Sequence, residues 1–189
     1  MSDCCAPPPF VPPAAKTSSG TMHTVVLIGP PNAGKSTLLS KLTNARPKIA
    51  DYPFTTLIPN LGVVNCEGGG HYKIADIPGI IEGAHLGHGL GLSFLQHIER
   101  VKVIIYMIEV TSEDPKYVLE LLKSEIASYN KMLAQKPSLI IVSKIDLATD
   151  EVVKKTVKSF GKKKVIPVSS ETGENLDALL RETEKLLGL

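Results

Sequence analysis

The feature that most constrains this chain is the octapeptide at residues 29–36, Gly-Pro-Pro-Asn-Ala-Gly-Lys-Ser. An apolar run at residues 25–28 precedes it, and a helical pattern with Leu38, Leu39 and Leu42 on one side follows it. Glycines let the backbone turn tightly enough for consecutive N–H groups to point into one anion-sized hollow, and the next helix adds its partial positive N-terminus. The order strand, Gly-xxxx-Gly-Lys-Ser, helix predicts a phosphate-binding P-loop.

Two side chains of this loop have predicted tasks. Lys35 would reach the β- and γ-phosphates of a nucleotide, and the Ser36 hydroxyl would ligate Mg²⁺. The residues assigned to nucleotide binding here are Gly29, Pro30, Pro31, Asn32, Ala33, Gly34, Lys35, Ser36 and Thr37. The alternative is a chance match in a glycine-containing loop, and the strand–loop–helix context argues against it.

The composition is that of a globular domain. The chain has 189 residues, of which 43% are hydrophobic and 21% charged, so it can bury a sizeable core. A formal net charge of +2 does not indicate nucleic-acid or membrane binding across the whole surface. No apolar run approaches the ~20 residues of a membrane span, and the N-terminus lacks the pattern of a signal peptide.

Three cysteines do not make a disulfide framework, because Cys4 and Cys5 are adjacent in a segment not expected to fold. Free thiols indicate a reducing compartment, the cytosol or an organelle matrix, and we assign the cytoplasm. A monomer is the default expectation.

Two segments are predicted. Residues 1–22 are rich in proline and bury little apolar area, so we expect a disordered tail or linker, with a ligand for a Pro-recognising partner as the alternative. Residues 23–189 are expected to form one folded domain.

Strands and helices are predicted to alternate along that domain. Expected strands are residues 25–28, 61–66, 71–77, 103–110, 139–142 and 165–168. Expected helices are residues 34–44, one through Phe94 and Ile98, one from Pro115 through Leu133, one through Val153 and Phe160, and one through Leu176 and Leu187. Asp114 before Pro115 is a helix-start signal, whereas residues 44–60 contain several prolines and are expected to form a loop.

This alternation predicts an α/β fold: a three-layer α/β/α P-loop NTPase with a mostly parallel sheet and one antiparallel strand at an edge. The antiparallel pair is the hairpin around Gly68. In such sheets ligands bind outside the carboxyl ends of the strands, so the loops after Ile28, Ile77 and Val142, and the one after Val168, should form the site.

The second of these loops reads Asp76-Ile77-Pro78-Gly79. Asp76 at a strand end can hold the Mg²⁺ hydration shell, and Gly79 N–H can approach a γ-phosphate closely because no Cβ intervenes. Alone, Asp-x-x-Gly is also a common turn. Its position after a P-loop favours the functional interpretation.

The third and fourth loops predict which nucleotide base the site binds. Ser143-Lys144-Ile145-Asp146 places a carboxylate where it can accept two hydrogen bonds from guanine N1–H and the 2-amino group, a donor pair that adenine lacks. The stem of Lys144 can lie over the base. Ser169, Ser170 and Glu171 could supply a backbone N–H to guanine O6, and a loop with a helix cap is the alternative.

These motifs in this order resemble the guanine-nucleotide-binding G domain. Three further segments are similar to the Obg family of ribosome-associated GTPases, which are of the translation-factor class: Ala-Asp-Tyr-Pro-Phe-Thr-Thr-Leu-Ile-Pro-Asn-Leu-Gly at 50–62, Ile-Ile-Glu-Gly-Ala-His at 80–85, and Phe-Leu-Gln-His-Ile-Glu-Arg at 94–100. The resemblance covers residues 23–189.

The resemblance implies a GTPase with GTP or GDP as ligand and Mg²⁺ as cofactor. Lys35, Thr56 and Gly79 would be its catalytic residues, and Thr56 would bind Mg²⁺ and the γ-phosphate. The segment closing on the nucleotide would be Phe54, Thr55, Thr56, Leu57 and Ile58. The resemblance also implies a partner, the large ribosomal subunit or its rRNA, and a role in subunit assembly and in growth or stress control.

The chain departs from the family in two respects. The family has Asn where this chain has Ser143, whose shorter side chain is not expected to reproduce the amide contacts to the base and the P-loop. We therefore expect weaker nucleotide affinity, with guanine preference retained through Asp146. The family also carries a Gly-rich N-terminal domain, and many members a C-terminal one, so we expect this chain to correspond to the G domain alone.

Ile80, as in the family, follows Gly79 where many GTPases have a water-orienting glutamine. We therefore expect slow intrinsic hydrolysis, with water positioned by backbone, by a partner or by a monovalent cation. Asn32 is the candidate K⁺ ligand.

Two alternatives and one surface remain open. A nucleotide-sensing docking module with little hydrolysis is the main rival, and a P-loop ATPase is a second that Asp146 argues against. A run of lysines around the predicted helix through Val153 and Phe160 is either an ordinary solvent-exposed surface or a contact to RNA phosphates. It consists of Lys154, Lys155, Lys158, Lys162, Lys163 and Lys164.

Overall fold

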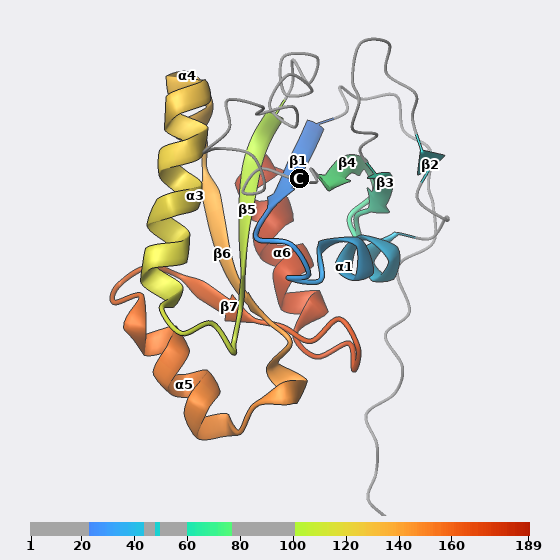
Figure 1. The fold of residues 1–189 in the computed structure, drawn as a ribbon. Coiled ribbons are helices and arrows are strands. Elements are labelled where there is room, and N and C mark those ends of the chain that lie inside the picture. Colours follow the sequence, from blue (N-terminus) through green and yellow to red (C-terminus); the bar gives the residue numbers. More distant parts are fainter. Residues whose placement is uncertain (1–22, 44–47, 50–59, 77–100) are drawn as a thin grey trace, which may run out of the picture.

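The computed structural model describes residues 23–43, 48–49, 60–76 and 101–189. Within these ranges, seven strands form one sheet in the order β2-β3-β4-β1-β5-β6-β7 (Figure 1). They are β1 (His23–Ile28), β2 (Lys48–Ile49), β3 (Asn60–Asn65), β4 (His71–Asp76), β5 (Val101–Glu109), β6 (Ser138–Ser143) and β7 (Val165–Pro167). Neighbours from β4 to β7 run parallel, and β3 runs antiparallel to both β2 and β4.

The predicted fold class is confirmed, including the antiparallel hairpin of β3 and β4. One expectation within the sheet is wrong: residues 44–60 were predicted to be a loop, yet Lys48 and Ile49 pair with Leu61 and Asn60. A strand of two residues is too short to show the alternation of apolar and polar side chains by which a strand is predicted from sequence. Because β2 forms the edge of the sheet, its partner β3 lies one place inside that edge.

Helices cover both faces of the sheet. They are α1 (Lys35–Leu42), α3 (Pro115–Tyr129), α4 (Lys131–Ala134), α5 (Asp150–Ser159) and α6 (Leu176–Leu187), with a 3₁₀ turn at Ile145–Leu147. Figure 1 shows α1 and α6 on one side of the sheet and α3, α4 and α5 on the other.

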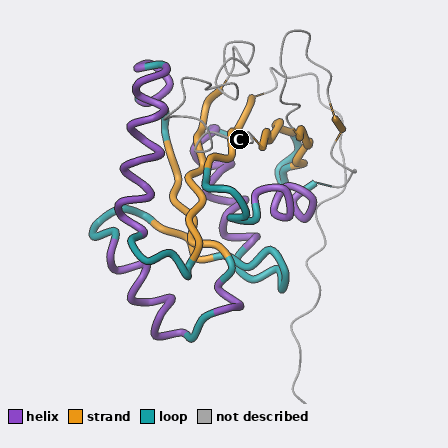
Figure 2. The backbone as a smooth tube through the Cα atoms, in the orientation of Figure 1, coloured by secondary structure: helices purple, strands orange, loops and turns teal. Residues whose placement is uncertain are grey.

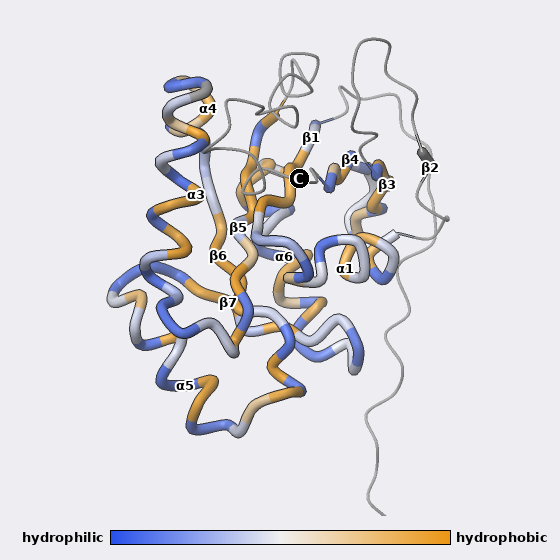
Figure 3. Tube along the Cα trace, in the orientation of Figure 1, coloured by the Kyte–Doolittle hydropathy of each residue, from blue (hydrophilic) through white to orange (hydrophobic). Residues whose placement is uncertain are grey.

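Alternation along β1 supplies both hydrophobic cores. Val25 and Leu27 pack in the core under α1 and α6, whereas Val26 and Ile28 pack in the core under α3 and α5. All four side chains are fully buried, as expected of a central parallel strand covered on both faces. Hydrophobic residues accordingly concentrate along the central strands in Figure 3.

The long helix after β5 begins as predicted and ends earlier. The Asp114 carboxylate accepts a hydrogen bond from Tyr117 N–H, and Pro115 occupies the first turn. The apolar spacing predicted one helix as far as Leu133, but the chain leaves helical geometry at Asn130. The Asn130 side chain accepts from Met132 and Leu133 N–H and so caps a separate short helix, α4.

No helix among the described residues is long and apolar enough to cross a bilayer. Cys66 is a buried free thiol, and Cys4 and Cys5 lie outside the described residues. The described loops that follow β1, β6 and β7 lie where these parallel strands end, together with Asp76 at the end of β4, and the loop joining β1 to α1 is drawn in teal in Figure 2. These loops form the candidate site.

Candidate nucleotide-binding site

The loop between β1 and α1 has the backbone that the P-loop motif predicts. Asn32 and Gly34 have positive φ, 62° and 94°, and α1 starts at Lys35. Gly29 also lies against β5, where an added Cβ would be 2.5 Å from the Met107 carbonyl oxygen. Any larger residue at position 29 would therefore push the loop away from the sheet.

Lys35 is held by the loop itself. Its side chain is buried, and Nζ donates to the carbonyl oxygens of Gly29 and Pro30, both at 2.9 Å. These bonds keep the ammonium group over the loop, where the phosphates of a nucleotide would bind.

Ser36 and Asp76 come together from α1 and β4. Ser36 Oγ donates to Asp76 Oδ2 at 2.6 Å, although the two residues are 40 positions apart. Asp76 is 2% exposed, and its Oδ1 has no hydrogen-bond partner among the described residues. A buried carboxylate oxygen without a partner is costly unless a cation or its water satisfies it, and Mg²⁺ prefers such oxygen ligands. The pair therefore fits the predicted Mg²⁺ site.

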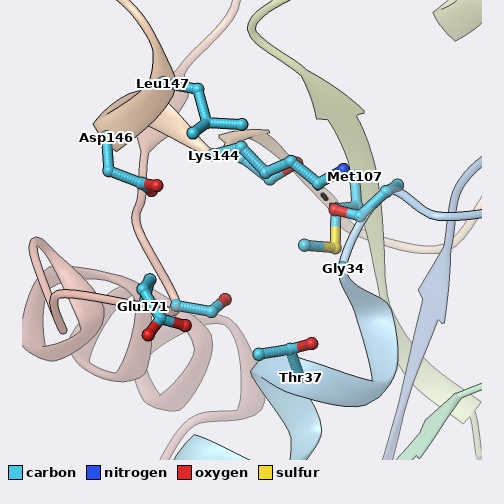
Figure 4. Close-up of a pocket in the computed structure, with 10 residues that line it drawn as sticks. Gly34, Thr37, Met107, Lys144, Asp146, Leu147 and Glu171 are labelled. Carbon is cyan, nitrogen blue, oxygen red and sulfur yellow. Dashed lines mark hydrogen bonds between the residues drawn. The ribbon is translucent and has the colours of Figure 1, made fainter.

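A pocket of about 200 Å³ adjoins the P-loop. Figure 4 shows Asp146 and Glu171 on one side of it and Gly34 and Met107 on the other. It is lined by Ala33, Gly34, Thr37, Met107, Ser143, Lys144, Asp146, Leu147, Ser170 and Glu171. The structure thus brings the P-loop and both predicted base-recognition loops to one pocket.

Asp146 is positioned before any base binds. Ser169 Oγ donates to Asp146 Oδ1, and the same hydroxyl oxygen accepts from Thr172 N–H at 3.1 Å. The bond from Ser169 uses one lone pair of Oδ1, so Oδ2 and the second lone pair of Oδ1 can still accept from a ligand. Ser170 is buried and its hydroxyl has no partner among the described residues, whereas Glu171 is exposed. The Ser169 loop therefore supports the carboxylate as well as lining the pocket.

Ser143 corrects one expectation. The sequence suggested that this serine could not replace the family's asparagine at the P-loop, but its hydroxyl donates to the Ala33 carbonyl oxygen at 2.8 Å. The side chain is 1% exposed, and a second acceptor, the Ile108 carbonyl oxygen, lies at 3.4 Å. The contact to the P-loop is therefore kept, because β6 ends directly beside the loop.

Sequence reasoning missed Glu109. Its carboxylate forms an ion pair with Lys144 Nζ, with the two side chains 26% and 32% exposed. Glu109 pairs in register with Ser143 across β5 and β6, so the sheet brings its side chain next to Lys144. An acidic residue that ends an apolar strand is the one sequence signal that could have indicated it. Met107 and Leu147, which also line the pocket, were missed as well.

Several predicted site residues lie outside the described part of the chain. They are Phe54, Thr55, Thr56, Leu57, Ile58, Ile77, Pro78, Gly79 and Ile80. Within the described residues, no group of three or more His, Cys, Asp or Glu side chains could hold a metal ion. The Ser36–Asp76 pair is thus the described contribution to a cation site.

Comparison with known proteins agrees with this geometry. Residues 24–144 match the family model described as "50S ribosome-binding GTPase". The chain is 47% identical over 161 residues to the GTPase Obg of Solibacter usitatus, covering 82% of this chain and 48% of that relative. It therefore spans about half the length of this curated relative.

Solved structures show the same fold. Aquifex aeolicus Era bound to GDP·AlF₄⁻ superposes with a TM-score of 0.69 at 29% identity, covering 87% of this chain and 56% of that one. Era in complex with MgGDPNP and nucleotides 1506–1542 of 16S ribosomal RNA superposes with a TM-score of 0.65 at 28% identity, with coverages of 87% and 56%. The chain belongs to the 50S ribosome-binding GTPase family, as a G domain of the Obg type.

Proposed function

We propose that this chain binds guanine nucleotide and hydrolyses GTP as a molecular switch. The observation that carries the proposal is the convergence of a P-loop lysine, the Ser36–Asp76 pair and the Asp146 carboxylate at the carboxyl ends of the parallel strands β1, β4 and β6. We assign this activity to residues 23–189, with residues 1–22 as a Pro-rich tail.

Each predicted site residue has a proposed role in binding or hydrolysis. Lys35 and the P-loop N–H groups would neutralise the charge that develops between the β- and γ-phosphates. The carboxylate of Asp146, fixed by Ser169, would accept from guanine N1–H and the 2-amino group. Mg²⁺ on Ser36 and Thr56, with Asp76 holding its waters, would polarise the phosphate oxygens. Thr56 and Gly79 are proposed to contact the γ-phosphate, and Phe54, Thr55, Leu57 and Ile58 to close over the nucleotide.

Nucleotide identity is the direct test. Fluorescent GDP should bind the purified chain in Mg²⁺ buffer, and fluorescent ADP should not bind in the same range. Single-turnover phosphate release, with and without large ribosomal subunits, then separates a hydrolysing switch from a sensing module. Tight GDP binding without phosphate release in either condition would favour the sensing module, and preferential ADP binding would support an ATPase.

The partner is proposed to be the large ribosomal subunit, contacted through its RNA, with a role in subunit assembly and in growth or stress control in the cytoplasm. The description of the matching family and the Era complex with ribosomal RNA support this proposal. Co-sedimentation with purified large subunits, compared between GDP and a non-hydrolysable GTP analogue, tests it. Equal pelleting with both nucleotides would contradict a switch at this partner.

We propose that Asn32 makes GTP turnover dependent on K⁺. Its side chain is exposed on the P-loop at a positive φ of 62°, and its amide oxygen is of the type that would ligate a cation beside the phosphates. We expect GTP turnover to be faster in K⁺ than in Na⁺ buffer, and Asn32→Ala to remove the difference. Equal turnover of the unmodified chain in both buffers would exclude the cation.

A further inference from the structure

A cluster of exposed lysines lies on α5 and the turn after it, away from the nucleotide pocket. Residues 150–164 contain six lysines and two acidic residues, whereas the whole chain has a formal net charge of only +2. Four of these lysines are exposed and, within the described residues, take part in no ion pair. They form what we call the α5 lysine surface: Lys154, Lys155, Lys158 and Lys162.

The packing of α5 explains why these lysines gather on one side. Val153 and Val157 pack against the core under α3, and Phe160 is part of that core. Lys154, Lys155 and Lys158 are therefore turned to solvent within about one helical turn, which is roughly 6 Å along the axis. Like charges at this spacing destabilise a helix slightly, so helix stability does not account for them.

The other two lysines of the run have intramolecular partners. Lys163 pairs with Glu120 of α3 at 3.1 Å, and Lys164 pairs with Glu182 of α6 at 2.6 Å. These pairs link the turn after α5 to helices on both faces of the sheet. Lys163 and Lys164 are therefore left out of the α5 lysine surface.

We propose that the α5 lysine surface binds the phosphate backbone of RNA. Lysine ammonium groups are compact point charges suited to phosphate contact without base recognition. An anionic membrane is a poorer match, because the only large hydrophobic side chain exposed on α5 is Val152 and no aromatic anchor accompanies it. This inference rests on the proposed ribosomal partner and adds where the RNA would bind.

The surface is compatible with a bound nucleotide. Of the six lysines in the run, none lines the nucleotide pocket, and α5 lies on the face of the sheet opposite α1 (Figure 1). At the same time, α5 begins three residues after Leu147, which does line the pocket. RNA and nucleotide could therefore be bound together.

The test compares two variants of equal charge in the full chain. Binding of a short RNA duplex is measured by fluorescence anisotropy at several KCl concentrations, and GDP affinity is measured in parallel. The surface variant carries Lys154→Gln, Lys155→Gln, Lys158→Gln and Lys162→Gln. The matched control removes four exposed lysines elsewhere: Lys41→Gln, Lys73→Gln, Lys102→Gln and Lys185→Gln.

The surface variant should bind the duplex at least about tenfold more weakly, and its slope of log Kd against log salt should be shallower by about 3.6 for four lost phosphate contacts, since each contact contributes ~0.9. The control should change little, and both should bind GDP like the unmodified chain. Equal losses in the two variants, no duplex binding by the unmodified chain, or tighter binding to phosphatidylserine vesicles would each overturn the proposal. Failure of the unmodified chain to bind GDP would instead contradict the proposed GTPase.

Discussion

Ser143 has one hydroxyl proton, and that proton is used by the Ala33 carbonyl oxygen of the P-loop. An asparagine amide has two N–H donors, so it could contact the loop and still offer a donor to the base. We therefore expect the serine to hold the loop through Ala33 and to leave the base with one contact fewer. The contact to the P-loop and the contact to the base, which an asparagine amide could make together, can therefore be tested separately at position 143.

Substitutions at Ser143 test that separation. Ser143→Ala would leave the Ala33 carbonyl oxygen without this donor, so we expect a loss of about 1–3 kcal/mol in the free energy of unfolding and weaker GDP binding. Ser143→Asn should tighten GDP binding, because it adds the base contact. Chemical denaturation and GDP titration measure both. No gain in affinity for Ser143→Asn would refute the idea that serine weakens the site.

Glu109 acts on the pocket through Lys144. Its carboxylate holds the ammonium group, which keeps the aliphatic stem of Lys144 along the pocket wall. We expect Glu109→Gln to weaken GDP binding about three- to fivefold, the range for a partly exposed ion pair of up to ~1 kcal/mol. The guanine preference over adenine should persist, because Asp146 is untouched.

A double-mutant cycle separates this role from a general loss of stability. In a Lys144→Met background, the Glu109→Gln change should no longer alter GDP affinity, because the methionine side chain has no ammonium group for Glu109 to pair with. Glu113→Gln, an exposed carboxylate nearby in sequence, is the matched control. A Glu109→Gln effect of the same size with and without Lys144 would rule out the positioning role.

The site residues that could be predicted from the sequence belong to short local motifs, whereas the missed ones depend on contacts between residues far apart in the sequence. Lys35, Ser36 and Asp146 stand in motifs whose spacing is itself the signal. Glu109 lies 35 positions from Lys144 and becomes its neighbour only through the register of β5 and β6. The loop contact of Ser143 likewise depends on an approach across 110 positions, which a short motif does not encode.

Among the elements, α1 and the threonine that follows it pack directly against β3 at Gly62. A Cβ built there would lie 2.2 Å from Thr43 Cγ2 and 3.1 Å from Leu39 Cδ1. Thr43 cannot easily move aside, because its hydroxyl donates to the Leu39 carbonyl oxygen at 2.8 Å and it is β-branched. The absence of a side chain at position 62 lets the P-loop helix pack against the sheet.

Gly62→Ala should therefore destabilise the fold by about 1–3 kcal/mol through overpacking. Adding Thr43→Ser, which removes the clashing methyl group, should restore part of that loss. Gly68→Ala in the same hairpin is the control, since an added Cβ there meets nothing within 4 Å. Urea denaturation of the four proteins measures the differences. Equal midpoints for the Gly62 and Gly68 variants would show that the packing tolerates a methyl group.

Element boundaries show where local chemistry overrides periodicity. The spacing of Ile126 and Leu133 fits one helix, and both side chains are buried. Asn130 nevertheless ends α3, because its side chain satisfies two backbone N–H groups in a non-helical conformation. β5 was predicted closely because a buried parallel strand is apolar along nearly its whole length.

At the scale of the whole molecule, the hairpin of β3 and β4 meets α6 at a group of ionisable side chains, the buried Cys66 and Tyr72 and the half-buried Glu184. Burial raises the pKa of the Cys66 thiol from 9.0 to about 11, with the nearby Glu184 carboxylate adding to the effect. Burial also raises the pKa of the Tyr72 phenol, and that of Glu184 itself. The fold therefore favours the neutral form of each group.

Stability should consequently fall in alkaline solution. Because the unfolded chain loses the Cys66 proton near pH 9 while the folded chain keeps it to about pH 11, the free energy of unfolding decreases as pH rises through this window. Tyr72 acts in the same direction at higher pH, because burial raises its pKa as well. Denaturation midpoints from pH 8 to 11 measure the slope, which should be shallower for Cys66→Ala. An unchanged slope would mean that the thiol does not contribute.

The last helix completes the core that the first strand begins. Leu176, Leu179 and Leu180 of α6 share one hydrophobic cluster with Val25 and Leu27 of β1. When the chain is made from its N-terminus, α1 is available early to this face of the sheet, but the part of the core that α6 completes stays exposed until residues 176–187 have been made. Since synthesis proceeds at roughly 5–20 residues per second, this core lacks its last helix for several seconds after β1 and α1 have been made. Protection from aggregation during synthesis therefore matters for this domain until its final helix is made.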